Sequence, residues 1–517
     1  MNSYIKCLLP IMLVLLFTNC TKRFNVINSD PGSITEAGKQ ELPFMFSTAE
    51  SWACINRSYY QTVQNLYADF YAQYFAQSTN DFTTDRYVIH DSWLPRMGII
   101  TYVNVVPQLQ SIFENTDSTS GQYALASMMW VYAFDHMTDY FGPIQYFDAG
   151  KAQAAIAYDA QDKIYGDFFK RLDQAVTNLQ KLGSGANVFG NYDLIYGGNV
   201  SKWILFANTL RLRLAMRVSK VDPSLAKQEA EAAVAAGVMT DISQSAWIAK
   251  SLNGRDGNGL SQVAAYNAFS MSSTMYSYLK GYNDPRLNIY FQPAVTTGTF
   301  RSVRNGSSTL ALNNPLNQPA QTSNVGPYWV TWNGSSWVAQ LTAPKPVIYA
   351  AEAYFLRAEG ALNGWNMGGN AQSLYEMGIR ESMEQWGITD QTVINNYINS
   401  TALPATPGDV ANSAAVAAIP VKWAQDEATE RQQIGTQKWL AIYPDAMEAW
   451  AEFRRTGYPK MYPVLESDNP DLPQGTFIRR LPYPSLEYST DLQQVQQGVT
   501  LLNGPDKVST RLWWDVN

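Results

Sequence analysis

The side chains best suited to chemistry in this sequence are aromatic. It contains 15 Trp, 31 Tyr and 21 Phe, but only two histidines, His90 and His136. Aromatic rings bind other molecules by stacking and burial, whereas acid–base catalysis and metal binding most often use histidine. The composition therefore favours recognition of a ligand over a histidine-based reaction or metal site.

The clearest candidate for recognition is the segment 328–338, where aromatic and β-branched residues flank Asn333-Gly334. Asn-Gly is a strong hairpin signal, because both central residues of the tight turn need positive φ. With these two residues as the loop, the pairs expected across the hairpin are Trp332 with Ser335 and Val330 with Trp337.

One face of this hairpin would be rich in rings. Strand alternation places on it Tyr328, Val330, Trp332 and Trp337, with the two indoles as diagonal neighbours. Flat indoles could stack on sugar rings or on the side chains of a peptide, and the same face could instead pack on the protein as core. We take as candidate ligand-binding residues of this segment Tyr328, Trp329, Trp332 and Trp337.

A second candidate is the polar, non-periodic segment 81–93, which contains Arg86, Tyr87 and Trp93. Arg86 could donate paired hydrogen bonds to ligand hydroxyls or a carboxylate, with Trp93 stacked beside it. The alternative is a surface loop with an ordinary ion pair.

Paired acids would be needed if the protein were a glycoside hydrolase. Glu352 and Glu359 lie two turns apart on an expected helix, and Arg357 between them suggests structural ion pairs instead. No G-x-S-x-G, H-E-x-x-H or phosphate-loop motif is present. We therefore expect a protein that is not an enzyme and needs no cofactor.

Two further clusters could bind an ion, but each also has a purely structural interpretation. The loop 253–259 could wrap a hard cation, but it lacks the spacing of an EF-hand, and a flexible turn is the favoured interpretation, so no metal site is assigned. Arg211, Arg213 and Arg217 could form a phosphate patch, but their helical spacing favours internal salt bridges. The net charge of −7 also disfavours nucleic acid as a partner.

Helical periodicity dominates the elements that must position these residues. The apolar pattern predicts helices over 164–179, over 203–220 and, after the break at Asp222-Pro223, up to the C-cap Gly237. A second helix pair is expected from Pro346 to Leu362 and over 371–386, where Gly378 allows the two helices to approach closely.

Between the helices lie stretches rich in Asn, Ser, Thr, Gly and Pro, at 285–346, 400–420 and 467–484. We therefore expect a mainly α fold, a tetratricopeptide-like array of helix pairs with an irregular, loop-rich half that contains short β-hairpins.

The first residues have the features of a targeting signal. A lysine precedes the apolar run 8–17, which is too short to span a bilayer. We expect a signal peptide over 1–19, lipidation of Cys20, a tether over 20–42 and a single domain over 43–517. Ordinary secretion and a disulfide from Cys20 to Cys54 are the alternatives.

Several motifs in order resemble the SusD/RagB family of nutrient-capturing outer-membrane lipoproteins. They are Asp139–Ile144, Asn208–Arg217, Asn283–Leu287, Phe355–Gly360, Thr436–Trp439, Glu448–Pro459 and Ile478–Pro484. The resemblance implies about four tetratricopeptide-like helix pairs beside a loop-rich half that holds the ligand. It also implies a partner, a TonB-dependent outer-membrane transporter of the SusC type, with the helix pairs packed on it.

From this resemblance we expect a protein that is anchored in the outer membrane by lipid and captures oligosaccharides for that transporter. Oligopeptide capture and a structural lid without its own ligand site remain open. Members of the family often carry acidic residues after the lipidated cysteine as a surface-export cue. Lys22 and Arg23 occupy that place here, so display on the cell surface is a weaker expectation than lipidation.

Overall fold

The computed structural model describes residues 38–153, 155–254 and 256–516. Of these, the residues from Pro43 onward belong to one compact unit. The expected signal peptide, the lipidation site Cys20 and most of the tether lie outside the described residues.

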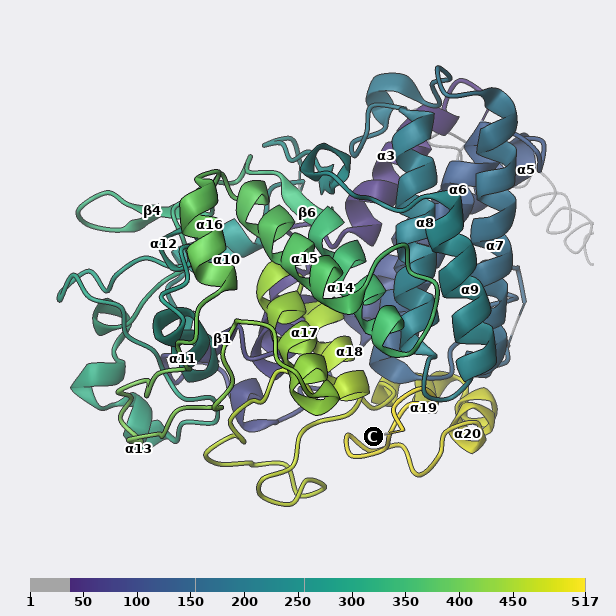
Figure 1. Ribbon diagram of the computed structural model, residues 1–517. Coiled ribbons are helices and arrows are strands. Elements are labelled where there is room, and N and C mark those ends of the chain that lie inside the picture. The colour runs from purple at the N-terminus through teal and green to yellow at the C-terminus, as the bar shows by residue number, and fades with distance from the viewer. Residues whose placement is uncertain (1–37, 154, 255, 517) are drawn as a thin grey trace, which may run out of the picture. The chain divides into compact units, whose positions relative to one another are not determined.

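Four helix pairs follow one another in the described part of the chain, the number that the family resemblance implied. They are α6 Gly121–Phe141 with α7 Gln161–Leu182, α8 Val200–Arg217 with α9 Pro223–Ala236, α14 Ala350–Leu362 with α15 Ala371–Gln385, and α17 Glu427–Ala441 with α18 Ala446–Thr456. Figure 1 shows α5 to α9 gathered together and α14, α15, α17 and α18 beside them. The prediction of a mainly helical, tetratricopeptide-like fold is confirmed.

Local sequence signals account for the ends of these helices. The Asp222 carboxylate accepts from the backbone N–H of Leu225 and caps α9, and Gly237 ends that helix with φ +99°. Between α14 and α15, a Cβ added to Gly378 would lie 2.8 Å from the ring of Phe355. The expected close approach of these two helices therefore depends on this glycine.

The remaining helices have 12 residues or fewer. They are α3 Leu42–Ala53, the π-helix Gln61–Asp69, α4 Pro95–Gly98, the π-helix Ile99–Val105, α5 Val106–Asn115, α10 Gly259–Ala265, α11 Ser273–Gly281, α12 Leu287–Tyr290, α13 Thr309–Leu312, α16 Gln391–Ile398, α19 Ser485–Thr490 and α20 Leu492–Thr500. Single 3₁₀ turns occur at Thr84–Arg86, Gly190–Tyr192, Ile242–Gln244, Pro315–Asn317 and Pro319–Gln321.

The strands of the described chain form three antiparallel pairs. β1 Phe75–Gln77 pairs with β3 Phe269–Met271, β2 Ala246–Ile248 with β6 Lys345–Ile348, and β4 Val330–Trp332 with β5 Trp337–Ala339. The prediction that the helix of α14 begins at Pro346 is wrong, because Pro346–Ile348 belongs to β6. The residues 346–348 hydrogen-bond to β2 instead, and the helix begins only at Ala350.

A network of buried charges joins the helix pairs to one another. Arg213 of α8 makes a bidentate ion pair with Glu352 of α14, at 2.8 Å from Nε and 2.6 Å from Nη2. Arg217 reaches Glu448 and Glu452 of α18 at 2.5 and 2.7 Å. The expected internal salt bridges are confirmed, although these two arginines connect different helix pairs, whereas Arg211 bonds Glu229 within its own pair.

Candidate ligand-binding surface

The hairpin β4–β5 carries two indoles opposite each other. Trp332 pairs directly with Trp337, and the ring centroids lie 5.3 Å apart with an interplanar angle of 61°. Trp332 is 39% exposed and Trp337 is half-buried. Val330, the pair's neighbour on the same strand face, is fully buried. The hairpin thus has a buried base and an aromatic tip.

The expected two-residue turn is wrong. The loop has four residues, 333–336, and the side-chain oxygen of Asn333 accepts from the backbone N–H groups of Ser335 and Ser336 at 3.0 and 2.9 Å. Only Gly334 of these four has positive φ, whereas the predicted turn needs two such residues. The longer loop makes the two indoles direct partners and not diagonal neighbours.

Two of the predicted hairpin residues are placed differently. Trp329 is 0% exposed and packs on Trp386 and Tyr443, so the prediction that it contacts ligand is wrong. Tyr328 lies in the turn before β4, outside the strand, and packs edge-on against Trp247 and Trp386. Burial raises the pKa of Tyr328 to about 12, and its neutral hydroxyl donates to the carbonyl of Pro344 at 2.9 Å.

The segment 81–93 is held mainly by structural contacts. Arg86 makes an ion pair with Asp468 at 2.6 Å, which is the alternative named for it above. Tyr87 is 2% exposed, so its prediction as a ligand contact is wrong. Trp93 remains half-buried and lies on His90, with ring centroids 4.2 Å apart. Among the described residues, no hydrogen bond or ring contact joins this segment to the hairpin.

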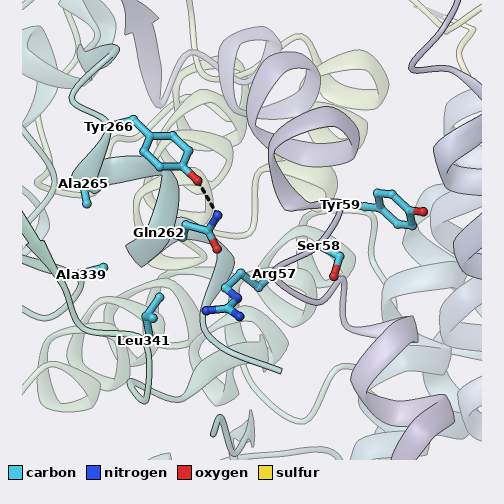
Figure 2. A pocket seen from close by; sticks show the side chains of 8 residues that line it. All are labelled: Arg57, Ser58, Tyr59, Gln262, Ala265, Tyr266, Ala339 and Leu341. Carbon is cyan, nitrogen blue, oxygen red and sulfur yellow. Dashed lines mark hydrogen bonds between the residues drawn. The ribbon is translucent and has the colours of Figure 1, made fainter. Parts of the chain in front are cut away.

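A pocket of about 700 Å³ lies beside the hairpin. It is lined from three directions, by Arg57 and Tyr59 after α3, by Gln262 and Tyr266 of α10 and its C-terminal end, and by Ala339 and Leu341 of and after β5. Figure 2 shows Arg57 between these groups and Gln262 donating to the hydroxyl of Tyr266. The volume falls within the range of about 300–1,000 Å³ that is usual for ligand sites.

The hairpin and the pocket share one strand face. Ala339 lies opposite Val330, and Trp337 is two residues before it, so alternation directs all three, with Trp332, to the same side. The two indoles therefore lie on the same strand face as Ala339, which lines the pocket. Arg96, three residues after Trp93, lies 5.2 Å from the ring centroid of Tyr59, which lines the pocket.

Arg57 gives the pocket a positive charge. Its Nη2 donates to the carbonyl of Gly254 at 3.0 Å, and no carboxylate in the described part of the chain lies within ion-pair distance of it. Tyr266 is 53% exposed and can offer both a ring face and a hydroxyl. Sequence reasoning missed Arg57, Gln262 and Tyr266, because they come together only through the fold and none of them belongs to a motif.

The other candidate clusters are engaged in structural contacts. Glu352 pairs with Arg213 and Glu359 with Arg455, whereas Arg357 donates to the carbonyls of Met367 and Gly368. In the loop 253–259, Asp256 accepts from the hydroxyl of Ser51 at 2.7 Å. No group of three or more potential metal ligands occurs among the described residues, and none of their helices is long and apolar enough to span a membrane.

A comparison with protein-family models matches residues 27–515 to the SusD-like family, described as Susd and RagB outer membrane lipoprotein. The chain belongs to this family. Its resemblance to the family motifs is thereby confirmed across nearly the whole length.

Solved structures of SusD homologues resemble this SusD-like chain throughout. A chitin-binding SusD homologue from Flavobacterium johnsoniae is 35% identical, with a TM-score of 0.83 over 92% of this chain and 98% of that one. A SusD-like protein from Bacteroides thetaiotaomicron is 32% identical, with a TM-score of 0.82 over 92% and 99%. Another structure, described as a chitin-binding protein, is 28% identical, with a TM-score of 0.76 over 92% and 100%. No curated protein matches.

The motifs typical of the SusD-like family form the scaffold of this chain. Arg286 bonds Asp284 at 2.6 Å and Gln437 at 3.1 Å, and all three side chains are buried. Arg454 donates to the carbonyl of Asp139 at 2.7 Å, and Arg480 to that of Phe141. The motifs that identify the family are therefore residues that stabilise the fold. The kind of ligand has to be inferred from the residues at the surface.

Proposed function

We propose that this SusD-like protein captures oligosaccharides at the outer membrane without cleaving them and passes them to a TonB-dependent, SusC-like transporter. The observation that carries the proposal is the pair Trp332 and Trp337, which lies on the same strand face as Ala339 of a pocket of about 700 Å³. Two structures similar to this chain are described as chitin-binding, so an N-acetylated oligosaccharide is the first ligand to test.

The groups around the pocket suit a neutral sugar chain. The C–H faces of sugar rings can lie on the indoles, each well-placed aromatic contributing about 1 kcal/mol beyond burial. Arg57, Gln262 and Tyr266 offer hydrogen bonds to hydroxyl and N-acetyl oxygens. Such modest contributions give weak binding with fast exchange, which suits the transfer of a ligand to a second protein.

Titration calorimetry with the protein lacking its signal and tether tests this proposal. The ligands are chitin oligosaccharides, maltooligosaccharides and oligopeptides of similar length. We expect chitin oligosaccharides to bind best and the double variant W332A/W337A to lose about ten-fold or more in affinity.

The matched control is Phe147→Ala, which removes a ring that is 46% exposed and outside the pocket lining. It should leave the affinity unchanged. Unchanged affinity in a well-folded W332A/W337A variant would exclude the indole pair as the site. Preferential binding of oligopeptides would change the ligand class and leave the site intact.

The location of the protein rests on the family and on the first residues of the chain. We infer that Cys20 is the lipidated N-terminus and that the body faces outward from the membrane, next to the transporter. Mass spectrometry of the mature protein should find a diacylated Cys20. An unmodified N-terminus at Thr21 would contradict the anchor, and protease resistance of the protein on intact cells would contradict surface display.

A further inference from the structure

A second pocket lies between two loops near the end of the chain. It has a volume of about 330 Å³ and shares no lining residue with the pocket beside the hairpin. Leu472 and Phe477 give it an apolar side, Thr476 and Ser509 supply hydroxyls at its rim, and Arg479 and Arg511 supply charge. This combination of an apolar wall and two guanidinium groups is typical of a site for a small acid.

The charges at this pocket are unbalanced. Arg511 Nη1 bonds Asp515 at 2.7 Å, and Arg479 Nη1 lies 3.4 Å from each oxygen of the same carboxylate. Asp515 is fully buried behind the two arginines, whose side chains are 20% and 39% exposed. Among the described residues that line the pocket or pair with its arginines, one carboxylate thus faces two guanidinium groups.

Both arginines keep donors for a further acceptor. Nε and Nη2 of Arg479 and of Arg511 have no hydrogen-bond acceptor within the part of the chain that is described. Burial and the neighbouring Arg511 lower the pKa of Arg479, although Asp515 opposes this. A second anion beside the two guanidinium groups would relieve their mutual repulsion.

The two loops are held together before any ligand arrives. The backbone N–H of Arg479 donates to the carbonyl of Val508 at 2.8 Å. Lys507 makes an ion pair with Asp471 at 2.6 Å, and Phe477 packs edge-on against Phe453 at 4.8 Å. A preformed pocket pays little ordering entropy on binding.

We propose that this pocket binds a small carboxylate on a ring-shaped or apolar skeleton, the chemistry of a uronic-acid residue. The carboxylate accepts from the free donors of Arg479 and Arg511, while the skeleton lies on Phe477 and Leu472. The site shares no lining residue with the hairpin pocket, and its two arginines give the protein a second place to recognise an acidic ligand.

Calorimetry and saturation-transfer NMR test this proposal with glucuronate, N-acetylleucine and the neutral analogue glucose, at constant ionic strength set with sodium chloride. Glucuronate should bind in preference to glucose. Comparable binding of N-acetylleucine would show that the carboxylate decides and the skeleton does not, and preference for glucuronate would assign the site to acidic sugars. Equal binding of glucuronate and glucose would overturn the proposal.

Two variants keep the result interpretable. Arg511→Gln leaves Arg479 to pair with Asp515 and should weaken glucuronate binding about ten-fold or more, because a charge-assisted hydrogen bond is lost. Ser509→Phe fills the pocket from its exposed rim without a change of charge and should also abolish binding. Arg380→Gln on α15, whose guanidinium bonds Asn395 at 2.9 Å, is the matched control. Wild-type affinity in either folded pocket variant would overturn the proposal.

Discussion

Asp85 is the buried residue around which the segment 81–93 is organised. Its carboxylate accepts from the backbone N–H groups of Gln77 and Gly306, each at 3.1 Å, and from the amide of Asn305 at 2.7 Å. Burial nevertheless raises the pKa of Asp85 from 3.8 to about 6, against the effect of these hydrogen bonds. The charged form is therefore less favourable in the folded protein than in the unfolded chain.

This pKa predicts a pH-dependent stability. Between about pH 4 and pH 6 the folded protein holds the proton of Asp85 and the unfolded chain has released it, so the free energy of unfolding falls as the pH rises. Asp85→Asn removes this titration. Urea unfolding of the variant should show a weaker fall from pH 4 to pH 7, by about 3 kcal/mol at most.

The replacement also has a pH-independent cost. An asparagine offers one acceptor oxygen where three donors converge, which should destabilise the variant by about 1–3 kcal/mol at low pH. Asp148→Asn, at an aspartate whose side chain is 43% exposed and pairs with Lys151, serves as the control and should follow the wild-type profile. Parallel pH profiles of wild type and Asp85→Asn would show that Asp85 does not carry the effect.

The candidate ligand residues show what a sequence can predict at this scale. Period-two alternation correctly grouped Val330, Trp332 and Trp337, because a strand fixes which side chains share a face. Strand alternation could not predict that the side chain of Trp329 is buried in the core. Its burial depends on contacts with Trp386 and Tyr443, which are distant from it in sequence. Burial of a single ring is decided by tertiary packing.

Gly378 sets the distance between α14 and α15. Since an added Cβ would lie 2.8 Å from the Phe355 ring, Gly378→Ala should force the helices apart and lower the free energy of unfolding by about 1–3 kcal/mol. Gly166→Ala on α7 is a matched control, because nothing lies within 4 Å of its added Cβ. It should be neutral or stabilise by about 0.5–1 kcal/mol. Equal effects of the two replacements in urea unfolding would contradict this role of Gly378.

The ion pair of Arg213 and Glu352 connects α8 with α14 inside the protein. Both side chains are 1% exposed or less, and Lys438 lies 3.4 Å from the same carboxylate. Glu352→Gln leaves buried positive charge without its partner and should destabilise by about 3–5 kcal/mol. The measurement is chemical unfolding, followed by circular dichroism.

An exposed ion pair provides the comparison. Glu427 and Arg431 lie 2.6 Å apart on the surface of α17, and Glu427→Gln should cost less than about 1 kcal/mol. A loss for Glu352→Gln as small as that of Glu427→Gln would mean that the other acids of the network take over its role. The contrast separates buried from solvated pairs in the same fold.

The helices α7, α8, α9 and α15 were predictable from the sequence because caps and apolar periodicity are local. Asp222, Gly237 and the small residue Gly378 all act as expected. The start of α14 was not predictable. Pro346 belongs to an apolar pattern that suits a helix or a strand, and only the pairing of these residues with β2 shows that they form a strand. Arg57 was missed for the same reason, because its neighbours in the pocket come from distant parts of the chain.

Over the whole molecule, the buried residues of the family motifs hold the scaffold, and the pocket beside the hairpin is lined by other residues. Buried arginines of the family motifs connect segments that are distant in sequence, as Arg454 does with Asp139 and Arg286 with Gln437. The rings and cations that border the two pockets lie in the irregular connections and in the hairpin. Such an arrangement lets the ligand change while the fold stays the same.

The same division predicts how uptake responds to mutation. In cells that lack the native protein and express W332A/W337A, the amount of lipoprotein at the membrane should stay at the wild-type level, because the two indoles lie at the tip of a hairpin. Uptake of chitin oligosaccharides at concentrations below the dissociation constant should fall about ten-fold or more, as capture is weakened. At saturating concentrations the difference should shrink, since the transporter is then supplied without tight capture. Cells without the protein give the reference for complete loss. Wild-type uptake by the double variant at low ligand concentration, together with loss of uptake in the deletion, would show that the protein acts as a lid on its partner and that its aromatic tip binds no nutrient.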